Sequence, residues 1–267
     1  MFSLIPISDA NPTRRFPVVT IALILINIAL FFQEPGLGTG TEATLYFYRN
    51  APVPCQMVDQ CPVGMPGPDA VPLSTFAWSL LFSTFLHGGF LHIGGNMLFL
   101  WVFGNNVEDH LGRVKYLAFY LLGGMFAALA HVAWALRDIG GAAARFDSCL
   151  LQAVGECAPP SAYVPAVGAS GAVAAVMGAY LLLFPKARIK VLVPIFILWT
   201  IVQMSAWVVL GLWFLFQFVT AAQEAYGATE VAWMAHVGGF VYGAVIIYLL
   251  GGRPQRPPPM LWQPGYR

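Results

Sequence analysis

Charged residues are scarce in this chain of 267 residues: they make up 9% of it, against 58% for hydrophobic residues, and the mean hydropathy is +0.71. An ordinary soluble domain carries about 25% charged residues. So few charges cannot cover a globular surface, which excludes a soluble enzyme. The net charge of +1 lacks the basic excess of a nucleic-acid-binding protein, so no nucleic-acid partner is expected. Long apolar blocks, without the alternation of a β-barrel, predict an all-α membrane protein.

Acidic residues are absent from these apolar blocks, although the chain contains twelve of them. A carboxylate pair, a proton relay or a carboxylate-bound metal site therefore cannot be built there, which weighs against a channel or proton-coupled carrier. The sequence also lacks the His-Glu-x-x-His motif of helical zinc proteases. We predict that the protein uses no metal and no other cofactor.

Six apolar segments can serve as membrane-spanning helices, each of which needs about 17–25 mainly apolar residues. The fifth belongs to a longer stretch, 191–222, which exceeds one span but cannot hold two. Pro194 and the polar break at 203–205 favour a short membrane-dipping piece followed by one span. We predict one domain over residues 1–267, with spans at about 16–32, 92–107, 116–136, 165–184, 206–222 and 231–252.

The basic residues divide unequally between the two sides of these spans. With the N-terminus inside, ten of the 13 Lys and Arg residues fall in inner segments and three in outer ones. This asymmetry is typical of positive-inside loops, so we expect both termini in the cytoplasm and residues 37–72 outside. Since no small-x-small cleavage site follows the first span, we expect it to be retained as an anchor.

All four cysteines fall in segments that the charge asymmetry places outside. Cys55 and Cys61 follow the first span, and Cys149 and Cys157 follow the third. Four cysteines allow three pairings. We expect the two local disulfides, Cys55–Cys61 and Cys149–Cys157, which imply an oxidising compartment. Four free thiols are the alternative.

Polar residues inside spans are costly in a bilayer and are therefore functional candidates. Ser170 lies five residues into the fourth span and His236 five residues into the sixth, so both would sit about 8 Å below the outer ends of parallel helices. His92 and Asn96, spaced i and i+4, project from one face of the second span at a similar depth.

These side chains suit acyl transfer. His236 can take the proton of the Ser170 hydroxyl and so activate it as a nucleophile. His92 and Asn96 can donate hydrogen bonds to a developing oxyanion. Because no acid is available to orient His236, the sequence predicts a Ser-His dyad.

Helix packing is the competing interpretation of this region, because small residues let membrane helices approach closely. The common depth of the serine, the histidine and the donors favours chemistry over packing alone. The small residues are Gly168, Gly171, Ala175 and Gly178 in the fourth span and Gly239 and Gly243 in the sixth.

Five motifs follow one another along the chain: the opening at 11–17, H-x-x-x-N within 87–96, G-x-x-x-E-x-x-x-G at 104–112, G-x-S-G at 168–171 and A-H-x-x-G-x-x-x-G at 235–243. In these motifs and their order the chain resembles the rhomboid family of intramembrane serine proteases. The resemblance implies a six-helix bundle that opens to the outside, with Ser170 as nucleophile, His236 as general base, and His92 and Asn96 at the oxyanion. Ala174 departs from the aromatic residue that some members carry one turn after the serine.

These observations predict a serine endopeptidase of a bacterial inner membrane. Its substrates would be single-pass transmembrane proteins, cleaved near the outer ends of their helices. The alternative is a catalytically silent rhomboid-like protein that binds transmembrane clients. Retention of both Ser170 and His236 favours the enzyme, since a binding protein needs neither.

Overall fold

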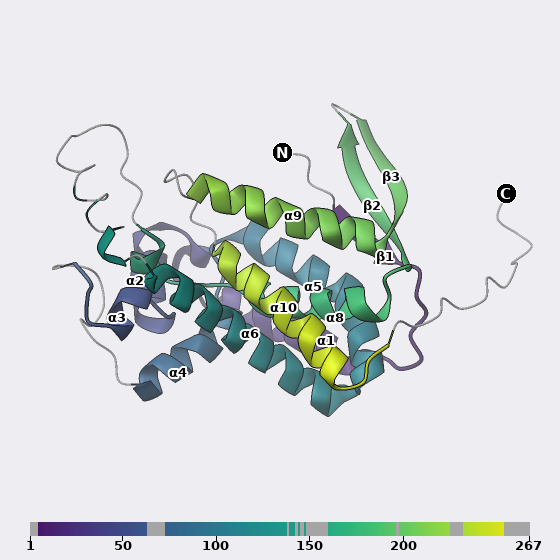
Figure 1. The fold of residues 1–267 in the computed structure, drawn as a ribbon, viewed down its shortest axis with the longest axis horizontal. Coiled ribbons are helices and arrows are strands. Elements are labelled where there is room, and N and C mark those ends of the chain that lie inside the picture. Colours follow the sequence, from purple (N-terminus) through teal and green to yellow (C-terminus); the bar gives the residue numbers. More distant parts are fainter. Residues whose placement is uncertain are drawn as a thin grey trace, which may run out of the picture.

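The computed structural model describes residues 5–62, 73–137, 139–141, 144, 147, 160–195, 198–224 and 232–253. These parts of the chain are mostly helical, as predicted (Figure 1). Six longer helices coincide in sequence, within a few residues, with the six predicted spans. They are α1 (Val18–Phe31), α5 (Phe90–Leu111), α6 (Arg113–Leu136), α8 (Ser170–Leu183), α9 (Ala206–Glu224) and α10 (Trp233–Leu249).

The lengths of these helices bear on how many of them cross a membrane. Among the described residues, Arg113–Leu136 is the one helix that is by itself long and apolar enough to do so. A second candidate is the pair Ser74–Phe85 and Phe90–Leu111, which is bent by 83° at its break. The other apolar helical stretches have 10–17 residues: Val18–Phe31, Ser170–Leu183, Ala206–Gln217 within α9, and Trp233–Leu249. The count of six spans therefore stays a prediction.

Helix α8 lies at the centre of the bundle, in contact with α5, α6, α9 and α10. Eleven of its 14 residues are buried. Helix α10 approaches α8 so closely that Gly239 and Gly243 face the backbone carbonyls of Gly171 and Ala175, where a side chain would collide. These glycines therefore have the packing role that small residues play between membrane helices.

Helix α5 continues past its predicted end at residue 107, because a buried acid finds partners there. Glu108 accepts hydrogen bonds from the backbone N–H groups of Val19 (3.0 Å) and Thr20 (2.8 Å) and from the Thr20 hydroxyl (2.8 Å). The carboxylate thus caps the N-terminus of α1. The predicted spans hold no acid, but the helix that contains the second span does.

Shorter helices gather at one end of the bundle, on the left of Figure 1. Residues 37–62 of this region, which the sequence places outside, are largely helical rather than an open loop. The elements are α2 (Gly40–Asn50), α3 (Pro54–Met57) and α4 (Leu73–Phe82), with 3-10 turns at Pro35–Gly38, Ser83–Phe85 and Ser161–Tyr163.

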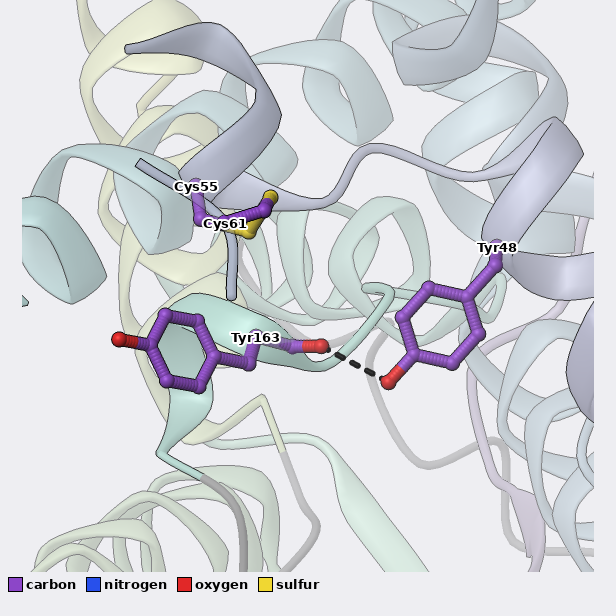
Figure 2. Close-up of a disulfide and its surroundings, with 4 residues drawn as sticks. All are labelled: Tyr48, Cys55, Cys61 and Tyr163. Atoms are coloured by element: carbon purple, nitrogen blue, oxygen red, sulfur yellow. Dashed lines mark hydrogen bonds between the residues drawn. A yellow bond between two sulfur atoms is a disulfide. The ribbon is translucent and has the colours of Figure 1, made fainter. Parts of the chain in front are cut away.

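The predicted disulfide between Cys55 and Cys61 is present, with the two Cα atoms 4.9 Å apart (Figure 2). Beside it, the Tyr48 hydroxyl donates a hydrogen bond to the backbone carbonyl of Tyr163 (2.9 Å). This hydrogen bond therefore joins α2, in the region after α1, to the turn at Ser161–Tyr163 that precedes α8. The other expected disulfide, between Cys149 and Cys157, lies outside the described residues.

Three strands form a small antiparallel sheet at the other end of the bundle: β1 (Ile5–Asp9), β2 (Arg188–Ile195) and β3 (Leu198–Ser205), in the order β1-β2-β3 (Figure 1). The all-α prediction is wrong in this part. Where a membrane-dipping piece was expected, the chain forms a β-hairpin. Residues 188–191 alternate between exposed and buried, which is the period of a half-buried strand.

Candidate active site

The structure brings Ser170 and His236 together, as the sequence predicts. The hydroxyl oxygen of Ser170 lies 2.8 Å from Nε2 of His236, which is hydrogen-bonding distance. Ser170 begins α8, and His236 lies in the first turn of α10. Since Gly239 packs on the backbone of Gly171, the two helices are close enough for these side chains to meet.

The depth of Ser170 in its helix differs from the prediction. The fourth span was expected to begin at Pro165, but α8 begins at Ser170 itself. Gly168 has a φ of +126°, a conformation that suits glycine and keeps this segment out of the helix. Ser170 is therefore at the N-terminus of α8, where free backbone N–H groups and the helix dipole favour negative charge.

Gln217 of α9 is a partner of His236 that the sequence analysis missed. Its Oε1 lies 2.6 Å from Nδ1 of His236, on the side of the ring opposite to Ser170. The Gln217 side chain is buried, with 9% of its surface exposed. Gln217 is a polar residue in the predicted fifth span, so the rule that singled out Ser170 and His236 would have found it.

An aromatic ring from the same helix lies against His236. The ring centres of Trp213 and His236 are 5.7 Å apart, and the planes are inclined by 44°. Trp213 also stacks on Phe240 of α10. Ala174, one turn after Ser170, has no ring to place against His236, and α9 supplies one from the next helix.

His92 lies beside the Ser170 hydroxyl, across Gly168. A Cβ atom placed on Gly168 would lie 2.8 Å from Nε2 of His92 and 3.5 Å from Oγ of Ser170. The backbone N–H of Gly88 donates a hydrogen bond to Nδ1 of His92 (3.2 Å). Because Nδ1 accepts this bond, the neutral ring carries its proton on Nε2, the atom that faces Gly168.

Asn96 lies one turn further along α5 and is buried, with 8% of its surface exposed. Its amide nitrogen Nδ2 has no hydrogen-bond partner among the described residues. Most buried amides in proteins are paired, so an unpaired donor one turn from His92 calls for an explanation.

Glu34 is a second residue that the sequence analysis did not single out. Its Oε1 accepts a hydrogen bond from the backbone N–H of His87 (3.0 Å), and 5% of its surface is exposed. Burial raises the pKa of Glu34 to about 7, against a smaller lowering by this hydrogen bond. Burial, with the nearby His92 as a lesser cause, lowers the pKa of His87 to about 3. His87, whose ring meets that of His92 edge-on, is thus a neutral, fully buried residue.

A small cavity opens at Ser170. Every side chain that lines it is the size of valine or smaller, including Ala127, Ala166, Val167 and Ala235. Among the described residues, no group of three or more His, Cys, Asp or Glu side chains is arranged to hold a metal ion.

Comparison with known proteins identifies the family. Residues 75–253 match the rhomboid domain, which is more than half of the chain. The chain belongs to the rhomboid family. This is a membrane-integral family that includes serine proteases, and membership supports a function of the intramembrane-protease kind.

Its rhomboid relatives come from distant organisms. The chain is 26% identical to rhomboid protease AarA of Providencia stuartii over 177 residues, which cover 64% of this chain and 53% of that protein. It is 28% identical to RHOMBOID-like protein 5 of Arabidopsis thaliana over 178 residues, or 67% and 45% of the two chains. It is 30% identical to the mitochondrial rhomboid protein 1 of Saccharomyces cerevisiae over 118 residues, or 43% and 28%. The chain thus spans about half the length of the first two relatives.

Proposed function

We propose that this rhomboid is a serine endopeptidase that hydrolyses peptide bonds of transmembrane proteins. The observation that carries the proposal is the 2.8 Å contact between Ser170 Oγ and His236 Nε2, made by two helices whose sequences are far apart. A serine hydroxyl becomes a useful nucleophile when a histidine takes its proton.

The proposed reaction has two stages. In the first, His236 Nε2 takes the Ser170 proton while Oγ bonds to the substrate carbonyl carbon. The C–N bond then breaks, and His236 returns the proton to the leaving amine. In the second stage, a water molecule deprotonated by His236 attacks the acyl-enzyme, which releases the new carboxyl group and restores the Ser170 hydroxyl.

The oxyanion of each tetrahedral intermediate is assigned to the space beside Gly168. His92 Nε2–H faces this space, and the unpaired amide of Asn96 is a further donor. The N-terminus of α8 adds backbone N–H groups. Donors fixed in this way stabilise a charge that develops in the transition state.

The proposed substrates are single-pass transmembrane helices, cut near their outer ends at a small residue. The small lining of the cavity at Ser170 supports a side chain such as that of Ala or Gly. A helical peptide bond is shielded by its own hydrogen bonds, so the substrate must unwind locally. A model substrate with Gly or Pro in its outer half should therefore be cleaved faster than an all-Leu helix, and equal cleavage of both would overturn this part.

The proposed topology has six spans, both termini in the cytoplasm and the site open to the outside of a bacterial inner membrane. Six apolar helices near the predicted positions and the ten-to-three distribution of basic residues support it. A C-terminal tag that is accessible only from outside the cell would contradict it.

Labelling with a fluorophosphonate probe tests the enzymatic function directly. Wild-type protein should react at Ser170, and Ser170→Ala should not. Ser79→Ala is the matched control, because Ser79 is a buried serine of α4 whose hydroxyl donates a hydrogen bond to the carbonyl of Phe76 (2.7 Å) and which does not line the cavity. Wild-type protein that neither labels nor cleaves a model substrate would instead be a silent client-binding rhomboid.

A further inference from the structure

His236 has two ring nitrogens, and the proposed reaction uses only one of them. For Nε2 to accept the Ser170 proton, the neutral ring must carry its own proton on Nδ1. Serine hydrolases with an acid in this position fix the ring that way. In this chain the atom next to Nδ1 is the amide oxygen of Gln217, at 2.6 Å.

The orientation of the Gln217 amide follows from its second contact. Its Nε2 donates a hydrogen bond to the backbone carbonyl of Trp213, at 3.4 Å. If the amide were turned over, its oxygen would face that carbonyl oxygen, and two acceptors would repel each other. The amide oxygen therefore faces His236, and an oxygen that only accepts requires a proton on Nδ1.

Helix α9 also restricts how the imidazole ring can move. Gln217 is buried, and the ring of Trp213, one turn before it, lies beside that of His236 with the two planes inclined by 44°. One helix thus supplies both a hydrogen-bond acceptor and a packing surface for the ring. Helices α8 and α10 supply the reacting pair, so the arrangement needs three helices rather than two.

From this geometry we infer that Gln217 is a positioning residue of the active site, which holds His236 in the Nδ1–H tautomer with Nε2 directed at Ser170. The inference rests on the proposed function and extends the predicted Ser-His dyad to a Ser-His-Gln arrangement. Because an amide is neutral, it orients the ring without supplying the charge of an aspartate.

Substitution of Gln217 tests this role. Gln217→Leu removes the hydrogen-bond acceptor, and we expect it to lower kcat and the rate of fluorophosphonate labelling by about 10²-fold, less than the roughly 10⁴-fold lost when the tautomer-fixing acid of a serine protease is replaced, because an amide carries no charge. KM for a transmembrane substrate should stay within about twofold, since Gln217 is behind His236. Gln217→Glu keeps an oxygen at Nδ1 and should recover much of the labelling rate.

Gln33→Leu is the matched control, because Gln33 makes the same kind of bond to the carbonyl four residues earlier (3.0 Å) but is exposed. It should label at the wild-type rate. All rates are compared per folded protein, and Gln217→Met replaces the leucine variant if that variant does not fold.

The outcomes separate the inference from the proposed function. If Gln217→Leu reacts with the fluorophosphonate at the wild-type rate while Ser170→Ala does not react, the inference is overturned but the proposed protease function stands. The inference also fails if Gln217→Leu loses activity only in proportion to its loss of thermal stability and Gln217→Glu does not recover that activity. This is the behaviour of a residue with a purely structural role. Absence of labelling in the wild type refutes the proposed function itself.

Discussion

Asn96→Ala offers a sharp test of the proposed oxyanion site, because we expect a large effect on activity and a small one on stability. If Nδ2 of Asn96 bonds to the transition state, its loss should lower kcat by about 10²–10³, or about 2.7–4 kcal/mol. Within the part of the chain that the structure describes, this buried donor has no hydrogen-bond partner. A buried unpaired polar group costs about 1–3 kcal/mol, and its removal offsets the packing that the side chain provides. We therefore expect the free energy of unfolding to change by less than about 1 kcal/mol.

Asn106→Ala is the matched control on the same helix. Asn106 is also buried, but its amide nitrogen donates a 2.7 Å hydrogen bond to Asp9. Its removal should lower the free energy of unfolding by about 1–3 kcal/mol and leave kcat per folded molecule unchanged. The assays are cleavage of a model substrate in liposomes and thermal unfolding in detergent. If Asn96→Ala loses stability and activity in proportion, Asn96 is a structural residue and the oxyanion assignment fails.

Three further predictions concern the scaffold. Glu108→Ala leaves three hydrogen-bond donors of α1 without their acceptor. We expect the free energy of unfolding, measured by denaturant titration, to fall by about 3 kcal/mol or more, and to fall less in Glu108→Gln. Cys61→Ser opens the bridge to Cys55 and should lower the free energy of unfolding by about 2 kcal/mol in thermal unfolding without reductant. With reductant present, the variant and the wild type should unfold alike. Burial raises the pKa of Glu34 from 4.5 to about 7, so between these pH values the folded protein keeps a proton that the unfolded chain has released. The free energy of unfolding should therefore fall as the pH rises from 4.5 to about 7. Glu34→Gln, which can still accept from His87, should flatten that part of the melting-temperature profile, and an unchanged slope would contradict the assignment.

The contact between Ser170 and His236 was predictable from sequence, because the positions of both residues in their apolar segments implied a common depth. The detail of the prediction was less accurate. Gly168 and the residues before it stay outside the helix, so Ser170 begins α8 rather than lying within its second turn. Hydropathy identifies an apolar segment but does not separate its helical residues from extended ones.

The features that sequence reasoning missed depend on partners far away in the chain. Glu108 is tolerated inside α5 only because the first turn of α1 supplies its hydrogen bonds. The hairpin at 188–205 pairs with residues 5–9, a contact that a local hydropathy window cannot contain. Gln217 is a different case, since a single amide in an apolar run was a visible signal.

The glycines of α8 and α10 show that packing and chemistry are not competing explanations of this site. Gly171 follows Ser170 directly, and Gly239 lies three residues after His236, so one of the close contacts between the two helices is next to the two polar side chains. A methyl group at Gly239 would meet the Gly171 carbonyl and force the helices apart. Even about 1 Å of separation would lengthen the 2.8 Å contact beyond the range of a good hydrogen bond. The small residues that join the helices are therefore also what sets the distance between Ser170 and His236.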